Sequence, residues 1–397
     1  MISRRAAALP PSSTATLDAH VKKLAADGVD VINLTGGELD FATPEAACGG
    51  GIDAIRDGFT RYTAVAGIPP LRAAVAARLT DRWRCAYRPG EIVMTNGAKQ
   101  ALANAFTVLL DPGDEVILQA PYWVSFPHMV TVAGGVPIIV ETGPETGFKL
   151  TPAAVEARIT PRTKVLLLNS PSNPTGAVYS RDELTSLAGI ALTHDLTIVS
   201  DEIYGDLVHS GAEFTSVASL GDEVWARTVT VGAFSKTFAM TGWRIGFAAA
   251  PHQVIDAMTA LQGHTSSAPS SISQRAALAV LEDEPVAQLR QRKSELERRR
   301  DLVADGLAAV SGLRLAVQPQ GAFFAFVDVS GAYGLQDDGV KIKDAATFAE
   351  RLLHGVGVAV MPAGDFGTPD HIRISYAVSG EEITEALRRI RRFLTHR

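Results

Sequence analysis

The sequence predicts an α/β fold, with a large domain built on a mostly parallel seven-stranded sheet covered by helices and a smaller α+β domain after it. From about residue 90 to 250, short β-branched runs alternate with longer stretches rich in Ala and Leu. This alternation is typical of a parallel sheet with helical crossovers. The pattern changes after Pro251, and 397 residues exceed one ordinary domain.

Seven short apolar runs are the predicted strands of the large sheet. They span residues 91–95, 115–119, 136–140, 164–169, 197–200, 228–231 and 244–250. Helices are expected between them, for example over 98–110 and 181–194. Ser180 precedes the second helix and Glu183 follows three residues later, which is the capping-box pattern of a helix start.

The rest of the chain alternates helix and strand candidates. We expect a helix near 252–262, a Ser- and Pro-rich loop over 263–273 that is ordered at an interface, and a charged helix over about 285–310. The charge run at 290–301 is typical of a solvated helix face. The candidates 321–329, 345–354, 371–377 and 381–393 suggest the smaller domain. We therefore expect an N-terminal segment over 1–45 that packs with the small domain, a large domain over 46–285 and a small domain over 286–397.

Composition excludes several classes of function. The net charge of -6 is spread along the chain, so no basic face for nucleic acid or an anionic membrane is expected. No apolar run approaches the roughly 20 residues that cross a bilayer, and Pro10 and Pro11 interrupt the N-terminal apolar stretch. Cys48 and Cys85 are too few for a disulfide framework and lack zinc-site spacing, so no metal is predicted. A cytoplasmic protein is expected.

An acidic pair directly follows one predicted strand, in the run Ser200-Asp201-Glu202-Ile203-Tyr204. Ligands bind at the carboxyl edge of an open α/β sheet, which is where Asp201 would lie. A lone Asp at such a place more often caps a helix. Its interpretation as a functional residue therefore depends on what else reaches the same edge.

Lys236 and Arg244 are the only charged residues in the segment 234–244, which follows another strand. A lysine among apolar residues is unfavourable unless it has a task. Desolvation and a nearby cation lower a lysine pKa from about 10.4, which makes the amine a nucleophile able to form a Schiff base. The planar guanidinium of Arg244 suits a phosphate dianion.

Two loops after strands complete the set. The run Asn96-Gly97-Ala98-Lys99 opens a predicted helix, whose backbone N–H groups and dipole favour phosphate. A Gly at such a turn is usually only geometry. Two prolines stiffen the run from Asn169 to Gly176 and direct Asn173 to the same sheet edge. Together with Asp201 and Lys236, these loops predict a site for a phosphorylated cofactor.

These residues and others give the chain a resemblance that runs nearly end to end. The matching segments are Gly36-Gly37-Glu38-Leu39-Asp40-Phe41, Tyr62 with Ala66-Gly67-Ile68-Pro69, Gly97-Ala98-Lys99-Gln100, Pro121-Tyr122-Trp123, Asn173-Pro174-Thr175-Gly176, Asp201-Glu202-Ile203-Tyr204, Ser235-Lys236 through Arg244, and Ile372-Arg373-Ile374-Ser375. The chain resembles the class I/II aminotransferases that use pyridoxal 5′-phosphate (PLP) and have PLP fold type I. Within that family it is similar to the bacterial aspartate aminotransferase-like branch.

The resemblance implies roles for the cofactor residues. Lys236 would hold PLP as an imine and move the substrate proton. Asp201 would pair with the pyridine nitrogen, and Tyr204 and Asn173 would bond the ring oxygen. Trp123 would stack on the ring, with Ser235 also at the cofactor. The catalytic residues would be Lys236, Asp201 and Tyr204.

The resemblance also implies how phosphate and substrate bind. The backbone of Gly97, Ala98 and Lys99, the Arg244 side chain and Tyr62 of a second subunit would hold the phosphate. A homodimer with shared active sites would follow. Arg373 would bind the substrate α-carboxylate as a bidentate pair, helped by Gly37 and Asn173, and Trp123 would line the substrate site.

Three departures from the family pattern stand out. Leu39 replaces a usual proline, and Ala233 replaces a serine that contacts phosphate in many relatives. Gly49-Gly50-Gly51 falls where relatives carry an ordinary helix, and each glycine weakens a helix by about 1 kcal/mol relative to Ala.

Three functions remain open at this point. Transamination between an aspartate-like amino acid and a 2-oxo acid such as 2-oxoglutarate is the leading one. The same cofactor residues also serve elimination, replacement, cyclisation or oxidation. A non-catalytic regulator with this fold is the third, although no DNA-binding pattern accompanies it.

Overall fold

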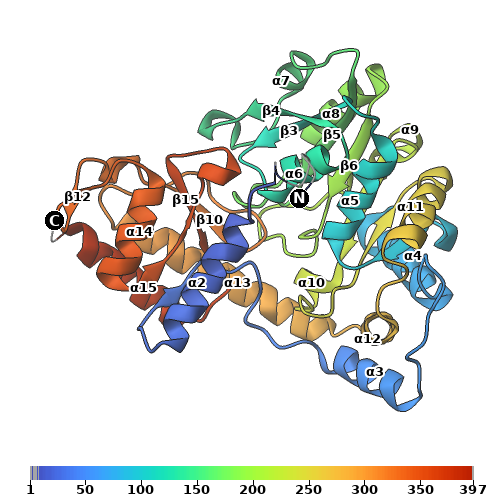
Figure 1. Ribbon diagram of the computed structural model, residues 1–397, viewed down its shortest axis with the longest axis horizontal. Helices are drawn as coiled ribbons and strands as arrows, with labels where there is room; N and C mark the ends of the chain where they lie inside the picture. The colour runs from blue at the N-terminus through green and yellow to red at the C-terminus, as the bar shows by residue number, and fades with distance from the viewer. Residues whose placement is uncertain (1, 3–6, 8, 396–397) are drawn as a thin grey trace.

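The computed structural model describes residues 2, 7 and 9–395. Its large sheet has seven strands in the order β2-β8-β7-β6-β5-β3-β4, as Figure 1 shows. The strands are β2 (Ile92–Thr95), β3 (Glu115–Ala120), β4 (Val136–Glu141), β5 (Thr163–Asn169), β6 (Thr197–Asp201), β7 (Thr228–Ala233) and β8 (Gly246–Ala249). All neighbours are parallel except β8, which is antiparallel to both β2 and β7. The predicted fold class and its seven strands are confirmed.

Alternation along the strands divides the sheet into two buried faces. On β5, Val165 and Leu167 pack in one cluster, with α5 (Ala98–Leu109), α6 (Ser125–Val132) and α11 (His252–Thr265). Leu166 and Leu168 pack in the other, with α7 (Pro152–Glu156) and α8 (Arg181–Thr193). Successive side chains of a strand point to opposite faces, so a strand covered on both sides is apolar throughout.

The smaller unit is built on an antiparallel sheet in the order β14-β15-β10-β9. Its strands are β9 (Arg314–Leu315), β10 (Phe324–Asp328), β14 (Met361–Pro362) and β15 (His371–Ser375). The helices α13 (Val286–Ala308), α14 (Ala345–Val356) and α15 (Gly380–Thr395) contribute to its core. A short hairpin of β11 (Gln336–Asp337) and β12 (Val340–Lys341) completes it.

The N-terminal segment lies against this smaller unit. The strand β1 (Ile32–Asn33) pairs in parallel with β13 (Val358–Ala359). In α2 (Ser13–Ala26), the buried Val21 packs against Leu353 and Ala359. α2 is thereby packed against the smaller unit, near the middle of the view in Figure 1. The domain limits at 45 and 285 stay a prediction, and most of the stretch before Pro10 lies outside the described residues.

The triple glycine run is helical in the structure, within α3 (Glu45–Arg56). A Cβ on Gly50 would lie 2.5 Å from the Ala279 Cβ, and one on Gly51 would lie 2.8 Å from the Trp243 ring. Ala279 belongs to α12 (Ser271–Glu282), which α3 contacts closely. Two of the three glycines are therefore explained by close helix packing, whereas a Cβ on Gly49 would meet nothing within 4 Å.

Two sequence predictions about the long helices need correction. The charge run 290–301 is not wholly solvated, because Arg292 and Arg299 are buried. Arg299 forms a two-bonded ion pair with Asp40 at 2.8 and 2.9 Å. The loop expected over 263–273 is shorter than predicted, because α11 continues to Thr265 and α12 begins at Ser271.

The remaining described helices include one long helix, whose Leu71, Val75 and Leu79 are buried in a further core cluster, and two short ones. They are α4 (Pro69–Trp83), α9 (Asp222–Trp225) and α10 (Phe234–Thr237), with the 3-10 turns η1 (Pro89–Glu91), η2 (Pro144–Thr146), η3 (Val217–Leu220), η4 (Ser330–Ala332) and η5 (Gly364–Phe366). Among the described residues, no helix is both long and apolar enough to cross a membrane.

Candidate active site

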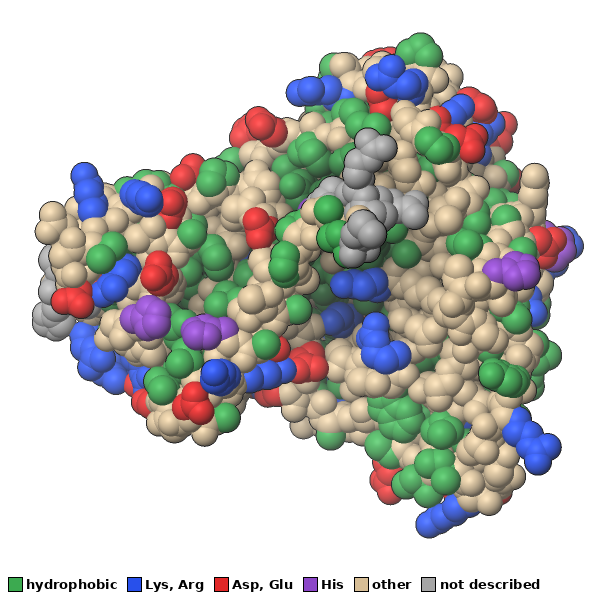
Figure 2. Space-filling model, viewed as in Figure 1, with side chains coloured by type: hydrophobic (Ala, Val, Ile, Leu, Met, Phe, Trp, Pro, Cys, Tyr) green, Lys and Arg blue, Asp and Glu red, His purple; other side chains and the backbone are tan. Residues whose placement is uncertain are grey.

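A cavity of about 490 Å³ lies between the two units, at the carboxyl ends of β5 and β6. Figure 2 shows it as a hollow with Lys and Arg side chains inside. Its lining includes nearly every residue that the sequence predicted for the site, except Gly97 and Tyr62. The sheet edge predicted from the strand-end loops is thus where these side chains meet.

Asp201 is the last residue of β6 and is only 4% exposed. The Ile203 backbone N–H donates to its Oδ1 at 3.2 Å, while its own carbonyl accepts from Asn169 Nδ2 at 3.1 Å. Burial raises the pKa of the Asp201 carboxyl to about 7, opposed by the hydrogen bond from Ile203 and the charge of Lys236. At neutral pH this carboxyl is therefore only partly ionised, and a cationic partner beside it would favour the ionised form.

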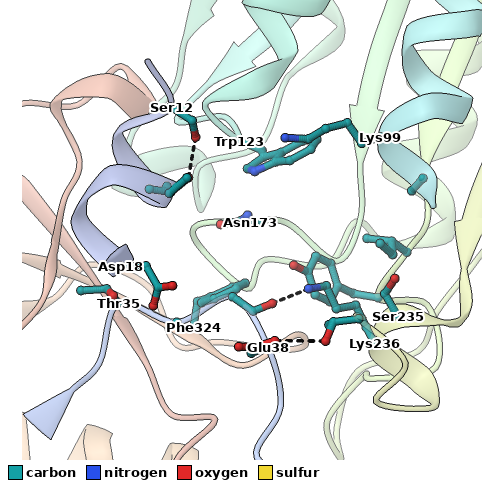
Figure 3. Close-up of a pocket in the computed structure, with 18 of the residues that line it drawn as sticks. Ser12, Asp18, Thr35, Glu38, Lys99, Trp123, Asn173, Ser235, Lys236 and Phe324 are labelled. Atoms are coloured by element: carbon teal, nitrogen blue, oxygen red, sulfur yellow. Dashed lines mark hydrogen bonds between the residues drawn. The ribbon is translucent and has the colours of Figure 1, made fainter. Parts of the chain in front are cut away.

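Lys236 lies in α10, the single turn that follows β7. Its Nζ donates to the carbonyl oxygen of Gly37, as the dashed line in Figure 3 shows. Burial lowers the pKa of Lys236 to about 8, helped by the nearby charges of Arg373 and Arg244. At neutral pH an appreciable fraction of this amine is unprotonated, the form that attacks a carbonyl carbon.

Arg373 enters the cavity from β15 of the smaller unit and is buried. Its Nη1 donates to Asn173 Oδ1 at 3.0 Å and its Nη2 to the Thr35 carbonyl at 2.7 Å. Its guanidinium lies 4.4 Å from the centre of the Phe324 ring, and its Nε has no hydrogen-bond partner among the described residues. Burial lowers the pKa of Arg373 to about 10. Both of these acceptors are neutral, so the cation is available to a carboxylate.

Aromatic residues shape two walls of the cavity. Tyr204 is buried, with its ring edge-on to Phe323 and Phe324 at 5.7 and 6.0 Å, and burial raises the pKa of its hydroxyl. Trp123 also lines the cavity, with Lys99 Nζ 4.8 Å from its ring centre. Figure 3 places the Trp123 and Lys99 side chains together above Asn173, and Ser235 and Lys236 below it.

The loop between β2 and α5, together with Arg244, forms the candidate phosphate site, called the phosphate cup below. Gly97 precedes α5 with φ of 80°, a conformation that favours glycine, and a Cβ there would lie 2.8 Å from Arg244 Nη2. Arg244 is exposed, and it donates to the carbonyls of Thr241 and Asn96 at 2.9 and 3.4 Å. A guanidinium thus lies against the N-terminus of a twelve-residue helix, an arrangement that binds phosphate.

Tyr62 does not reach the cavity of its own chain. Its side chain is 96% exposed and lies outside the lining. Its predicted contact with the phosphate of a second subunit stays a prediction. Of the departures, Leu39 is buried in the core cluster of the smaller unit, and Ala233 is the buried last residue of β7.

The structure adds residues that sequence reasoning missed. Ser12, Thr14, Asp18 and Lys22, all in or next to α2, line the cavity, and so do Glu38 and Thr241. Lys22 Nζ lies 2.8 Å from Asp18 and 3.7 Å from Glu38, and Thr241 donates to Glu38 at 3.0 Å. The sequence treated Lys99 only through its backbone, although its side chain also lines the cavity.

These observations fit PLP, a planar pyridine with an aldehyde and a phosphate. A nucleophilic amine, a buried carboxyl that forms no ion pair with the described residues, an aromatic wall and a phosphate cup all line or adjoin one cavity. The fold and site together define a PLP-dependent enzyme of fold type I.

Comparison with known proteins specifies the family. The family model described as "Aminotransferase class I and II" matches residues 29–390, so the chain belongs to that family. It is 43% identical to the aspartate aminotransferase of Geobacillus stearothermophilus, over 100% of this chain and 99% of that protein. It is 44% identical to the aspartate/prephenate aminotransferase of Thermus thermophilus, over 99% and 98%. The solved structure of Thermus thermophilus aspartate aminotransferase with maleate superposes with a TM-score of 0.94 at 43% identity, covering 99% of this chain and 100% of that one.

The protein is therefore a PLP-dependent transferase that moves an amino group between an amino acid and a 2-oxo acid. Among the three functions left open by the sequence, the relatives support transamination.

Proposed function

We propose that this aminotransferase acts on an amino acid with an acidic side chain, such as aspartate, and returns the amino group to a 2-oxo acid such as 2-oxoglutarate. The observation that carries this proposal is the excess of positive charge in the cavity. Lining residues that ionise are Asp18, Lys22, Glu38, Lys99, Asp201, Lys236, Arg244 and Arg373. In the described part of the chain, Lys22 is paired with two carboxylates, whereas Lys99, Lys236, Arg244 and Arg373 form no ion pair.

Each of these unpaired cations has a suitable partner in the proposed reaction. We assign Lys236 to the PLP aldehyde. We assign the side chain of Arg244, together with the backbone of Gly97, Ala98 and Lys99, to the phosphate. Arg373 supports binding of the substrate α-carboxylate, because its planar fork matches two carboxylate oxygens. The Lys99 ammonium then remains for a second carboxylate on the substrate side chain. A dicarboxylic amino acid would pair its α-carboxylate with Arg373 and its side-chain carboxylate with Lys99.

Bound PLP supplies an electron sink for the negative charge left at the substrate Cα. Asp201, which we assign to the pyridine nitrogen, would hold that nitrogen protonated by its charge. Once released from the cofactor, the Lys236 amine would take the Cα proton and return it to the cofactor carbon. A pKa near 8 suits that exchange at neutral pH, because the amine both accepts and donates a proton readily.

The other assigned residues position rather than react. Asn173 already accepts from Arg373 through its Oδ1, so it can align the guanidinium while its amide nitrogen would donate to the cofactor oxygen. Tyr204, whose raised pKa keeps its hydroxyl protonated, supplies a donor for the same oxygen. Trp123 supports stacking on the ring, and Ser235 is a buried neighbour of Lys236 that lines the cavity.

We further propose a homodimer in which Tyr62 contacts the phosphate bound by the partner subunit. A tyrosine that is 96% exposed next to a structured loop supports a role outside its own chain. A cytoplasmic location is proposed from the free thiols of Cys48 and Cys85.

The Lys99→Met variant tests the substrate proposal directly. We expect kcat/KM for aspartate to fall by about tenfold to a hundredfold, because a charge-assisted contact contributes roughly 1.5–3 kcal/mol. With alanine, which has no second carboxylate, kcat/KM should change by less than about threefold. Equal losses for the two substrates would refute the assignment of Lys99 to the side-chain carboxylate.

A further inference from the structure

Two fully buried glutamines form hydrogen bonds with the segment that follows Tyr62. Gln262 in α11 and Gln274 in α12 are both 0% exposed. A buried amide is unfavourable unless its donors and acceptor are paired. In both residues each amide nitrogen donates two hydrogen bonds and each amide oxygen accepts one. Both amides are therefore hydrogen-bonded at their nitrogen and their oxygen, and their partners show which segments they join.

Gln274 joins the segment after Tyr62 to the loop that precedes α12. Its Oε1 accepts from the Ile68 backbone N–H at 2.7 Å. Its Nε2 donates to Thr63 Oγ1 at 3.0 Å and to the Pro269 carbonyl at 2.8 Å. One side chain therefore fixes both ends of the segment 63–68 and ties it to the loop 266–270.

Gln262 joins the same segment to the strand that leads to the phosphate cup. Its Nε2 donates to the carbonyls of Val65 and Met94, each at 2.9 Å. Its Oε1 accepts from Asn104 Nδ2 at 3.2 Å. Met94 lies in β2, directly before the turn that contains Gly97. Gln262 therefore holds the segment 63–68 to β2 of its own subunit, in addition to the contacts made by Gln274.

The far end of the segment is also held by the Met94 N–H, which donates to the Ala66 carbonyl at 2.9 Å, and by the burial of Ala66 and Ile68. The end next to Tyr62 is exposed or half-buried over residues 61–64. Residues 61–66 form neither helix nor strand, and Tyr62 projects into solvent. Fixing one residue's backbone costs roughly 1–2 kcal/mol, so a segment free in solution would incur that cost when it meets a partner. Because the glutamine contacts already order part of the segment in the folded chain, less backbone entropy is lost when the segment binds the partner subunit.

We infer that Gln262 and Gln274 are positioning residues that hold Tyr62 ready for the phosphate site of the partner subunit. The inference rests on the shared site of the proposed function. The PLP affinity of one active site would then depend on the buried amides of Gln262 and Gln274 in the other subunit. A merely structural role would lower stability without that dependence.

Hybrid dimers separate the two roles. One chain carries Lys236→Ala, which removes the covalent link at its own site, and the other keeps Lys236; two affinity tags isolate the hybrid. Gln274→Met, of similar volume, is placed in either chain. Gln274 is preferred to Gln262 because its hydrogen bonds do not involve β2.

The readout is the dissociation constant for PLP at the intact site, followed by the visible absorbance of the bound cofactor. With Gln274→Met in the Lys236→Ala chain, we expect affinity to weaken by about tenfold, comparable with the loss of one hydrogen bond to a charged group. With Gln274→Met in the intact chain, we expect a change below about twofold. Equal effects from both placements, or no effect from the first, overturn the inference.

Two further variants keep the outcome unambiguous. Tyr62→Phe in the Lys236→Ala chain tests the shared site itself, and no effect there would refute the shared site and the inference together. An effect of Tyr62→Phe without one of Gln274→Met refutes the inference alone. If Gln274→Met does not fold, Thr63→Val removes one of its acceptors at a half-buried position, and it should weaken PLP binding by about threefold in trans only. A loss equal in both placements would contradict the inference.

Discussion

The two sides of the active-site cavity are built differently. On the sheet side, Asp201, Asn173 and Lys236 follow strands or strand-end loops, and the first two are buried. On the N-terminal side, Asp18 and Lys22 come from the surface helix α2, with side chains 30% and 60% exposed. The first group is fixed by backbone and buried hydrogen bonds, and the second by an exposed ion pair.

This difference predicts where reaction chemistry and substrate choice reside. Rigid, water-excluded groups hold reacting atoms in place and interact strongly, because the surrounding dielectric is low. Exposed ion pairs contribute only about 0–1 kcal/mol and are screened by salt. Substitutions on the sheet side should therefore lower kcat strongly, whereas those on the α2 side should change KM slightly.

The Asp201→Asn variant should give the largest effect. Asparagine cannot carry the negative charge that we assign to the pyridine nitrogen, so we expect kcat to fall by about a hundredfold to a thousandfold. The measurement is single-turnover kinetics with aspartate. Glu202→Gln is the matched control, since Glu202 is an adjacent buried carboxyl outside the cavity lining. We expect it to cost less than about tenfold, and a similar loss in both variants would break the comparison.

The Asp201 carboxyl should also make the free energy of unfolding of the cofactor-free protein depend on pH. Asp201 ionises near 4 when unfolded, but burial raises its pKa in the folded chain to about 7. Between these values the folded state holds the extra proton, so the contribution of Asp201 to the free energy of unfolding falls as pH rises.

Cofactor-free Asp201→Asn lacks this titration. Its stability relative to the wild type should therefore rise by roughly 2 kcal/mol between pH 5 and pH 7. Urea unfolding of both proteins at the two pH values measures this difference. A constant difference would show that Asp201 is not desolvated as described.

The Arg373→Lys variant should raise KM for every amino acid tested. Lysine keeps the charge but not the planar fork, and it loses the contacts with Asn173 and Thr35. We expect KM to rise by about tenfold to fiftyfold with a smaller change in kcat. Steady-state kinetics with aspartate and alanine provide the check, and an effect limited to aspartate would contradict the assignment of Arg373 to the α-carboxylate.

The smallest effect is expected from Lys22→Met on the α2 side. Lys22 is already paired with Asp18 and Glu38, so its removal should change KM for aspartate by less than about threefold. The loss should also shrink as salt concentration rises. A change as large as that of Lys99→Met would show that the two sides of the cavity do not differ in the way proposed.

The sequence predicted those parts of the site that follow strands. Lys236 and Arg244 stand alone among uncharged residues, and Asp201 ends an apolar run. The local residue pattern was therefore sufficient to select these three positions as candidate site residues. The fold class followed from the same alternation. The antiparallel direction of β8 could not be predicted in this way, because an apolar run carries no information on strand direction.

The missed residues depend on contacts between distant parts of the chain. α2 reaches the cavity only because β1 pairs with β13, far along the sequence, and its Ser, Thr, Asp and Lys residues are typical of any surface helix. Gln262 and Gln274 lie in amphipathic helices, where a glutamine usually faces solvent. The three glycines suggest only a weakened helix until Ala279 and Trp243 are placed against two of them.

The most direct test of the assigned chemistry is the position of the covalent link to PLP. Holoenzyme is reduced with borohydride, digested and analysed by mass spectrometry. We expect one modified lysine, Lys236, and the loss of both the adduct and turnover in Lys236→Ala. An adduct on Lys99 or any other side chain, or turnover retained in Lys236→Ala, would contradict the assignment.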